Sequence, residues 1–213
     1  MTATILANAQ PLALPEPNKQ GGMPLAEALQ ARRSVREFDA TREITPQQLS
    51  DLLWSACGVN RPYEEKRTNP TAMNSQEIDV YVFKADGVYY YDFRHHEIAK
   101  VADGDHRSLV AGNDDFSQPF VLDAPVSLVM IADLTRFERE SPMNPKMAAM
   151  DAGIVSQNIN LFCAANGLAT VPRVTMDGAG ITALLNLPAT SVPLINNPVG
   201  YEKPADAPAP NAE

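Results

Sequence analysis

Three arginines, Arg32, Arg33 and Arg36, surround Ser34 in the short stretch RRSVR. Guanidinium groups are planar, permanently charged donors that match the geometry of a phosphate. The whole chain carries a formal net charge of −9, so the cluster is a local positive feature in a negatively charged protein. Two interpretations remain open from these residues. The cluster is either a cation-rich helix end, which the helix dipole favours, or a pocket for a small anion such as a phosphate.

Motifs for several other chemistries are absent. The sequence has no GxSxG, GxGxxG, GxxxxGK[ST] or HExxH pattern. His95 and His96 are adjacent and His106 stands alone, so we predict no metal site. Cys57 and Cys163 lie far apart without CxxC spacing, and we expect buried thiols rather than a disulfide or a zinc site. An enzyme without an evident nucleophile, base or metal takes its reactivity from an organic cofactor.

Composition sets further limits on the class of protein. The 213 residues, 45% of them hydrophobic and 20% charged, suffice for one sizeable core. A pI near 4.8 argues against a nucleic-acid or anionic-membrane surface. No apolar run approaches the roughly 20 residues that span a bilayer. The start, MTATILANAQ, lacks the charged and apolar regions of a signal peptide, so we expect a cytoplasmic protein, or a periplasmic one if a signal has been trimmed.

The arginine cluster must be positioned by the elements around it. We predict a Pro-rich extended arm over residues 1–23, a folded domain over 24–203 and a flexible tail over 204–213. Helical periodicity predicts a helix over residues 25–32, which ends at the cluster. A second helix is predicted after Thr45, with Thr45 and Gln48 as a capping box and Gly58 as the stop.

The remaining pattern alternates strands and helices. Strands are predicted over residues 78–85 and 87–93, joined by an Asp86–Gly87 turn, over 124–133 as a central strand, and over 192–201. We predict short helices within 95–111, a long helix over 144–166 and a helix capped by Asp177. Small and apolar residues nearly all round the long helix indicate burial, including burial against another subunit. The class is α+β or α/β.

Three stretches, taken together and in order, resemble motifs of the nitroreductase family of flavin-dependent oxidoreductases. They are RRSVREF after the first predicted helix, NPTAMNSQ after the second, and NGLATVPRVTMD at the end of the long helix. NPVGYEK near the end of the chain is similar to the closing motif of the family. The resemblance covers residues 24 to 203. It implies an α+β fold in which helices flank a central, mostly antiparallel sheet, in a homodimer with flavin mononucleotide (FMN) at the interface.

The resemblance also implies roles for particular residues. Arg32, Arg33 and Ser34 would hold the phosphate or ribityl chain of FMN, and Arg36 would reach the polar edge of its ring. The other implied cofactor-binding residues are Gln118, the loop residues Pro70, Thr71 and Ala72, which would contact the flavin bound mainly by the other subunit, Asn74, which would fix the loop or approach the ring, and the turn residues Pro172, Arg173, Val174 and Thr175. The N–H of Val174 is the implied donor to flavin N5. No side chain is implied to be catalytic.

The activity implied by the resemblance is hydride transfer from NADH or NADPH, through flavin N5, to an electron-poor acceptor such as a nitroarene or a quinone. Two departures leave alternatives open. The segment YYYDFRHHEIAKVADGDHR is similar to a hairpin in oxidases of peptide-derived heterocycles, which suggests an FMN-dependent oxidase or dehydrogenase without nicotinamide. Val174–Thr175 stands where many members carry Glu-Gly, which suggests a flavin-binding protein without turnover.

Overall fold

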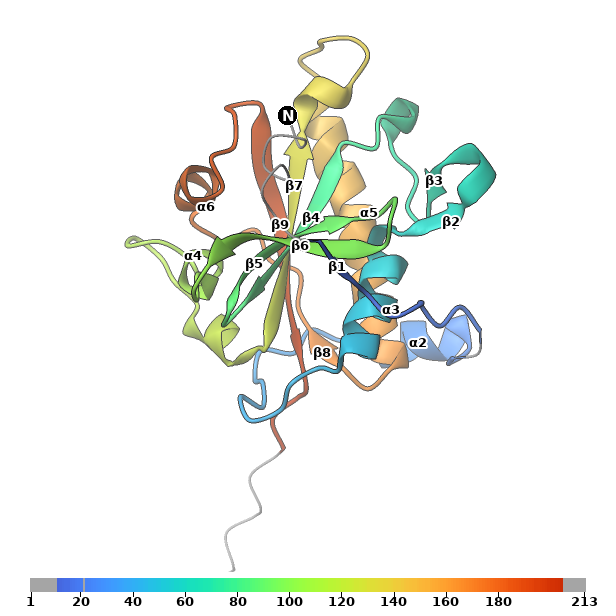
Figure 1. Cartoon of the computed structure of the whole chain (residues 1–213). Coiled ribbons are helices and arrows are strands. Elements are labelled where there is room, and N and C mark those ends of the chain that lie inside the picture. The colour runs from blue at the N-terminus through green and yellow to red at the C-terminus, as the bar shows by residue number, and fades with distance from the viewer. Residues whose placement is uncertain (1–10, 21, 205–213) are drawn as a thin grey trace, which may run out of the picture.

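The centre of the protein is a seven-stranded sheet in which every neighbouring pair is antiparallel (Figure 1). The computed structural model describes residues 11–20 and 22–204. The strand order of the seven-stranded sheet is β1-β6-β5-β4-β7-β9-β8. The bounds are β1 (Pro11–Ala13), β4 (Ile78–Lys84), β5 (Gly87–Asp92), β6 (Glu97–Asp103), β7 (Val126–Asp133), β8 (Ala169–Thr170) and β9 (Ser191–Gly200). A separate ribbon pairs β2 (Val59–Arg61) with β3 (Lys66–Arg67).

Helices cover both faces of this sheet. On one side lie α2 (Leu25–Ala31), α3 (Pro46–Cys57) and α5 (Asn144–Ala165), and on the other lie α4 (Arg107–Ala111) and α6 (Gly178–Leu184), as Figure 1 shows. Single 3-10 turns occur at η1 (Pro62–Glu64), η2 (Ala72–Asn74), η3 (Pro119–Asp123) and η4 (Leu134–Arg136). Within the described ranges, no helix combines the length and the apolar character needed to cross a bilayer.

The side chains of β7 alternate between two hydrophobic cores. Leu128 and Met130 pack toward α3 and α5, whereas Val129 and Ile131 pack toward α4 and α6. All four are buried, which confirms the prediction of a central strand covered on both faces. The predicted burial of both cysteine thiols is also confirmed.

The predicted helix ends agree with the structure. The Thr45 hydroxyl accepts from Gln48 N at 3.1 Å, and Gln48 Oε1 accepts from Thr45 N at 2.9 Å, which completes the capping box of α3. Asp177 caps α6 by accepting from Gly180 N at 2.8 Å. After α5, Gly167 adopts a φ of +66°, the left-handed conformation that commonly ends helices.

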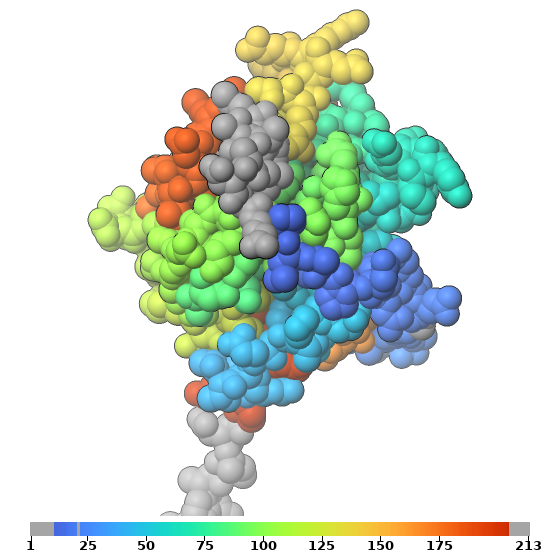
Figure 2. Space-filling model, viewed as in Figure 1, coloured from blue at the N-terminus to red at the C-terminus, as the bar shows by residue number. Residues whose placement is uncertain are grey.

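One expectation needs correction. Residues 97–103 form β6 rather than a helix, because they pair along β5 from Asp92↔Glu97 to Gly87↔Asp103; only α4 within 95–111 is helical. The described part of the arm includes β1, which adds an edge strand to β6. Figure 2 shows the described arm in dark blue, running from the sheet toward α2. Residues 1–10 of the predicted arm and 205–213 of the predicted tail lie outside the described residues.

Candidate functional site

The arginine cluster begins where α2 ends and continues as an extended segment. Val35 N donates to Thr170 O at 3.0 Å, which joins the segment to β8. Phe38 forms a β-bridge with Glu202, and Lys203 N donates to Glu37 O at 3.0 Å. Buried Val35 and Phe38 anchor this segment. The cluster is therefore held between the end of the chain and the strand that follows α5.

The three arginine side chains of this segment differ in whether they form hydrogen bonds or ion pairs. Arg33 forms an ion pair with Glu202 across the two segments. The side chains of Arg32 and Arg36 make no hydrogen bond or ion pair with any residue that the structure describes. Ser34 is exposed beside them. An acidic protein that leaves two guanidinium groups of one short segment without a compensating carboxylate among the described residues has a local attraction for an anion.

The turn over residues 172–175 is fixed to β9 through Asn196. Arg173 N donates to Asn196 O at 2.8 Å, and Asn196 N donates to Arg173 O at 2.7 Å. The Asn196 side chain donates to Thr175 O at 2.9 Å. Between these anchors, Val174 is 75% exposed, and its N–H has no hydrogen-bond acceptor in the described part of the chain. The turn thus presents an unused backbone donor.

The side chain of Arg173 is buried and serves as an anchor. Its Nε donates to Gln118 Oε1 at 2.8 Å, and its terminal nitrogens donate to Asn196 Oδ1 at 2.8 Å and to the carbonyls of Val110 and Ala111, each at 3.0 Å. Burial, together with the nearby charge of Arg36, lowers the pKa of Arg173 to about 10. These contacts bring Gln118, the turn and the arginine cluster into one region.

The loop that contains Pro70, Thr71, Ala72 and Asn74 lies elsewhere on the protomer. Ala72 N donates to Asp151 Oδ2 at 2.7 Å, near the beginning of α5. The arginine cluster instead borders a cavity of about 180 Å³ whose lining includes Arg33, Thr170 and Cys163, near the end of α5. Asp151 and Cys163 are about 18 Å apart along the helix axis.

One face of α5 is exposed and apolar between these two ends. Met150 is 64% and Ile154 36% exposed, and Leu25 and Leu29 of the neighbouring α2 are also exposed. A Cβ added to Gly153 would meet no atom of this chain within 4 Å. This surface has the small and apolar character of a helix-packing surface.

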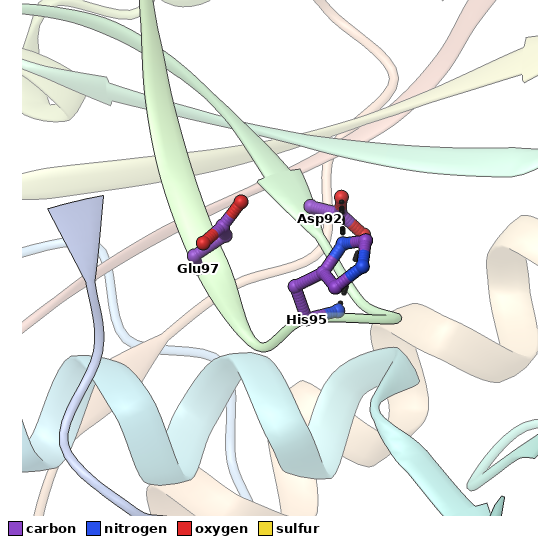
Figure 3. A group of neighbouring side chains, drawn as sticks. All are labelled: Asp92, His95 and Glu97. Carbon is purple, nitrogen blue, oxygen red and sulfur yellow. Dashed lines mark hydrogen bonds and ion pairs between the residues drawn. The ribbon is translucent and has the colours of Figure 1, made fainter. Parts of the chain in front are cut away.

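A separate group of side chains has the types that bind metals. The ligand atoms of Asp92, His95 and Glu97 lie within 4.8 Å of one another in the β5–β6 turn (Figure 3). His95 Nδ1 lies 2.8 Å from Asp92 Oδ2, and Asp92 raises the pKa of His95. The hydrogen bond between Asp92 and His95 accounts for the position of these two side chains without a metal ion.

Sequence reasoning did not identify Asn196, Asp151 or Glu77, which hold the turn and the loop in place. The pair Asn196–Asn197 in an apolar strand was an available signal, because a buried amide requires partners. Asp151 and Glu77 carried no comparable signal, since their partners come from distant parts of the chain.

Comparisons with known proteins identify the fold and the family. The model of the nitroreductase family matches residues 29–201. A crystal structure described as a "putative nitroreductase" from Ralstonia eutropha JMP134 is 34% identical, with a TM-score of 0.83, and the match covers 92% of this chain and 90% of that one. The search of curated proteins finds no match.

Two more distant structures show the same fold. A nitroreductase family protein from Clostridium novyi NT is 18% identical, with a TM-score of 0.62 over 85% of this chain and 86% of that chain. A chain of the E. coli microcin synthetase McbBCD complex is 18% identical, with a TM-score of 0.68 over 91% of this chain and 79% of that chain. The family match and the 34% identical structure together establish that this chain belongs to the nitroreductase family.

Proposed function

We propose that this protein is an FMN-dependent oxidoreductase that transfers electrons from NADH or NADPH to an electron-poor acceptor such as a nitroarene or a quinone. The observation that carries the proposal is the pair of guanidinium groups on Arg32 and Arg36, which have no partner among the described residues. Arg36 lies close enough to Arg173, the neighbour of Val174, to lower its pKa, so Arg36 is in the region of the unused Val174 N–H. This donor set fits a ligand with an anionic tail and a ring that accepts a hydrogen bond.

The phosphate of FMN would be held by Arg32 and Ser34. Both side chains are accessible at the end of α2, and charge-assisted bonds from arginine to phosphate are among the stronger hydrogen bonds in proteins. Arg33 is paired with Glu202, so its contribution requires that the pair open or be shared with the phosphate. FMN when bound supplies the ring that accepts and releases a hydride.

The protein's own groups would orient the ring and stabilise its charge. The Val174 N–H would donate to flavin N5, because the anchors on both sides of Val174 hold this amide in a fixed position. Arg36 would place positive charge at the polar edge of the ring, where reduction adds negative charge. Buried Arg173 adds to the positive potential there and fixes the turn. Gln118 and Pro172 would complete the surroundings of the ring.

We further propose a homodimer with FMN at the interface. In one protomer the loop of Pro70–Asn74 and the arginine cluster lie at opposite ends of α5. Two-fold packing of the apolar α5 faces in antiparallel orientation would bring the loop of one protomer to the cluster of its partner. Burial of Met150 and Ile154 would then contribute about 25 cal/mol for each Å² of apolar surface removed from water.

The test is an absorbance spectrum of the purified protein, after addition of FMN if required, before and after anaerobic addition of NADH or NADPH. The expected result is bound flavin whose visible absorbance is lost on reduction. A protein that does not bind added FMN would exclude the flavoprotein assignment. Bound flavin that neither nucleotide reduces would instead favour an FMN-dependent oxidase that takes electrons directly from its substrate. Flavin reduced without turnover of a quinone or nitroarene would favour a binding protein.

A further inference from the structure

The loop after Pro70 has an unusual backbone. Met73, Asn74 and Gln76 adopt φ values of +54°, +55° and +50°, the left-handed region that residues other than glycine seldom occupy. Three such residues within four positions cost conformational energy that neighbouring contacts must offset. Asn tolerates this conformation, but Met and Gln have no such preference. The shape of this loop therefore depends on the groups that hold it.

Asp151 of α5 provides one of these contacts. Its Oδ2 accepts from Ala72 N at 2.7 Å, and its side chain is buried. Within the loop, Gln76 N donates to the Thr71 hydroxyl at 3.0 Å. A carboxylate that accepts from a backbone amide at this distance forms a charge-assisted bond. Asp151 thus fixes the loop to α5, the helix that would pack against the partner.

Glu77 provides the second contact, through Ser75. The Ser75 Oγ lies 2.6 Å from Glu77 Oε2 and 2.8 Å from Ala72 O. A hydroxyl has one proton and cannot donate to two acceptors. All three atoms are satisfied when a protonated Glu77 donates to Ser75 and Ser75 donates to Ala72 O. Ser75 N also donates to Ala72 O at 3.1 Å, so these contacts fit a neutral acid, and the surroundings of Glu77 decide between its neutral and its ionised form.

The surroundings of Glu77 agree with a neutral side chain. Glu77 is fully buried, and its Oε1 has no hydrogen-bond partner, an arrangement that is much less costly for an acid carbonyl than for a carboxylate. Burial, followed by the neighbouring Asp151 carboxylate, raises the pKa of Glu77. The nearby cation Arg136 donates to Gln76 O and pairs with Asp79 and Asp133.

We propose that Glu77, as the neutral acid, and Asp151 are a pair of positioning residues that set the shape of the Pro70–Gln76 loop for contact with FMN. Asp151 holds the Ala72 N–H, while Glu77, through Ser75, holds the Ala72 carbonyl. The backbone N–H and the backbone carbonyl of Ala72 are thereby both held by side chains of the protein. This inference rests on the proposed function for its ligand, but the arrangement itself is a property of the protein without cofactor.

Amide hydrogen exchange at Ala72 in the protein without FMN tests the arrangement directly. Asp151→Ala and Ser75→Ala should each speed this exchange at least tenfold and weaken FMN binding, measured by flavin fluorescence, at least tenfold. Glu77→Gln should preserve both, because the glutamine amide also donates to Ser75. Exposed Glu138 supplies the matched control, Glu138→Gln, which should alter neither. Asp151→Asn retains an acceptor and should give an intermediate exchange rate, even if Asp151→Ala does not fold.

A pH series separates positioning from a general structural role. Relative to Glu77→Gln, the wild type should lose FMN affinity as pH rises between 5 and 9, because ionised Glu77 cannot donate to Ser75; the comparison cancels the ionisation of the FMN phosphate, which both proteins share. Glu77→Gln as disruptive as Ser75→Ala, or unchanged exchange in both Asp151 variants, would overturn the inference. Failure of the wild type to bind FMN would refute the proposed function, while the exchange measurements would still decide the arrangement around Ala72.

Discussion

Arg173 and Asn196 are joined by three hydrogen bonds, two between their backbones at 2.8 and 2.7 Å and one from the guanidinium to the asparagine Oδ1 at 2.8 Å. Asn196 is fully buried, and its amide also donates to Thr175 O. One strand residue therefore determines where the turn around Val174 lies. The turn gains its fixed geometry from the sheet rather than from its own sequence.

Asn196→Ala should lower the free energy of unfolding by about 2 kcal/mol, because it removes one bond to a charged group and leaves buried polar atoms without partners. Urea denaturation measures the change. The exposed Asn60 offers a control, and Asn60→Ala should cost less than about 0.5 kcal/mol. Equal stability of the two variants would show that the Arg173 network contributes nothing to the fold.

Arg32→Ala should weaken FMN affinity at least about tenfold, since the loss of a partner from a charged group costs roughly 1.5–3 kcal/mol. Titration of flavin fluorescence at low and high salt measures this, and the difference between variant and wild type should shrink as salt screens the charge. Arg139 is also exposed, and Arg139→Ala should leave affinity unchanged. Wild-type affinity in Arg32→Ala would remove Arg32 from the site.

Ile154→Asp should convert the proposed dimer to monomers, because it places a charge at the centre of the exposed α5 face. Light scattering after size-exclusion chromatography measures the mass, and FMN affinity should fall in parallel because each site needs the partner's loop. The control is Ala183→Asp at an exposed position of α6, a helix on the other side of the sheet. A wild type that is already monomeric while binding FMN would contradict the shared site.

His96 should make stability depend on pH. Its Nε2 lies 2.7 Å from the Ser50 Oγ, which donates to Pro15 O, and its Nδ1 lies 2.8 Å from the Tyr91 hydroxyl. A neutral ring that donates from Nε2 satisfies these contacts, and burial lowers the pKa of His96 below 6.5. The unfolded state then binds more protons, so stability should fall as pH decreases below 6.5, by at most about 1.4 kcal/mol per pH unit.

The measurement is the free energy of unfolding between pH 5 and 7.5 in the wild type, His96→Gln and His95→Gln. His96→Gln should be less stable at pH 7.5 and should lose this acid-dependent slope. The contribution of His95 to stability depends on pH in the opposite direction. Asp92 raises the pKa of His95, so this contribution is lost as pH rises through the raised value. Exposure makes the His95 effect small. An unchanged slope in His96→Gln would assign the acid sensitivity to other groups.

The sequence predicted those elements whose local signals agree with the tertiary structure. The capping box of Thr45 and Gln48 marked the start of α3, and Gly167 marked the end of α5. Strand β6 was missed because its Glu, Ala and Lys residues favour helices locally. Pairing with β5 decides its conformation, and that information lies in the neighbouring strand.

At the candidate site, too, the sequence predicted only part of the structure. The arginine cluster and the turn could be identified from motifs, and the structure brings them together through Arg36 and Arg173. The contact of Asp151 with Ala72 joins residues 79 positions apart, so no local pattern could reveal it. The protonation of Glu77 depends on its burial and on its partners, which only the folded structure supplies. Motifs thus indicate which segments matter, and packing determines how they are held.

The short strand β1 has a consequence for how the protein behaves at high concentration. By pairing with Glu97, Ile98 and Ala99, it covers backbone donors and acceptors at one end of β6 that would otherwise be open to strands from other molecules. The strand at the opposite edge, β8, has only two residues. Both terminal strands of the sheet are therefore short, and short edge strands offer little template for the growth of fibrils.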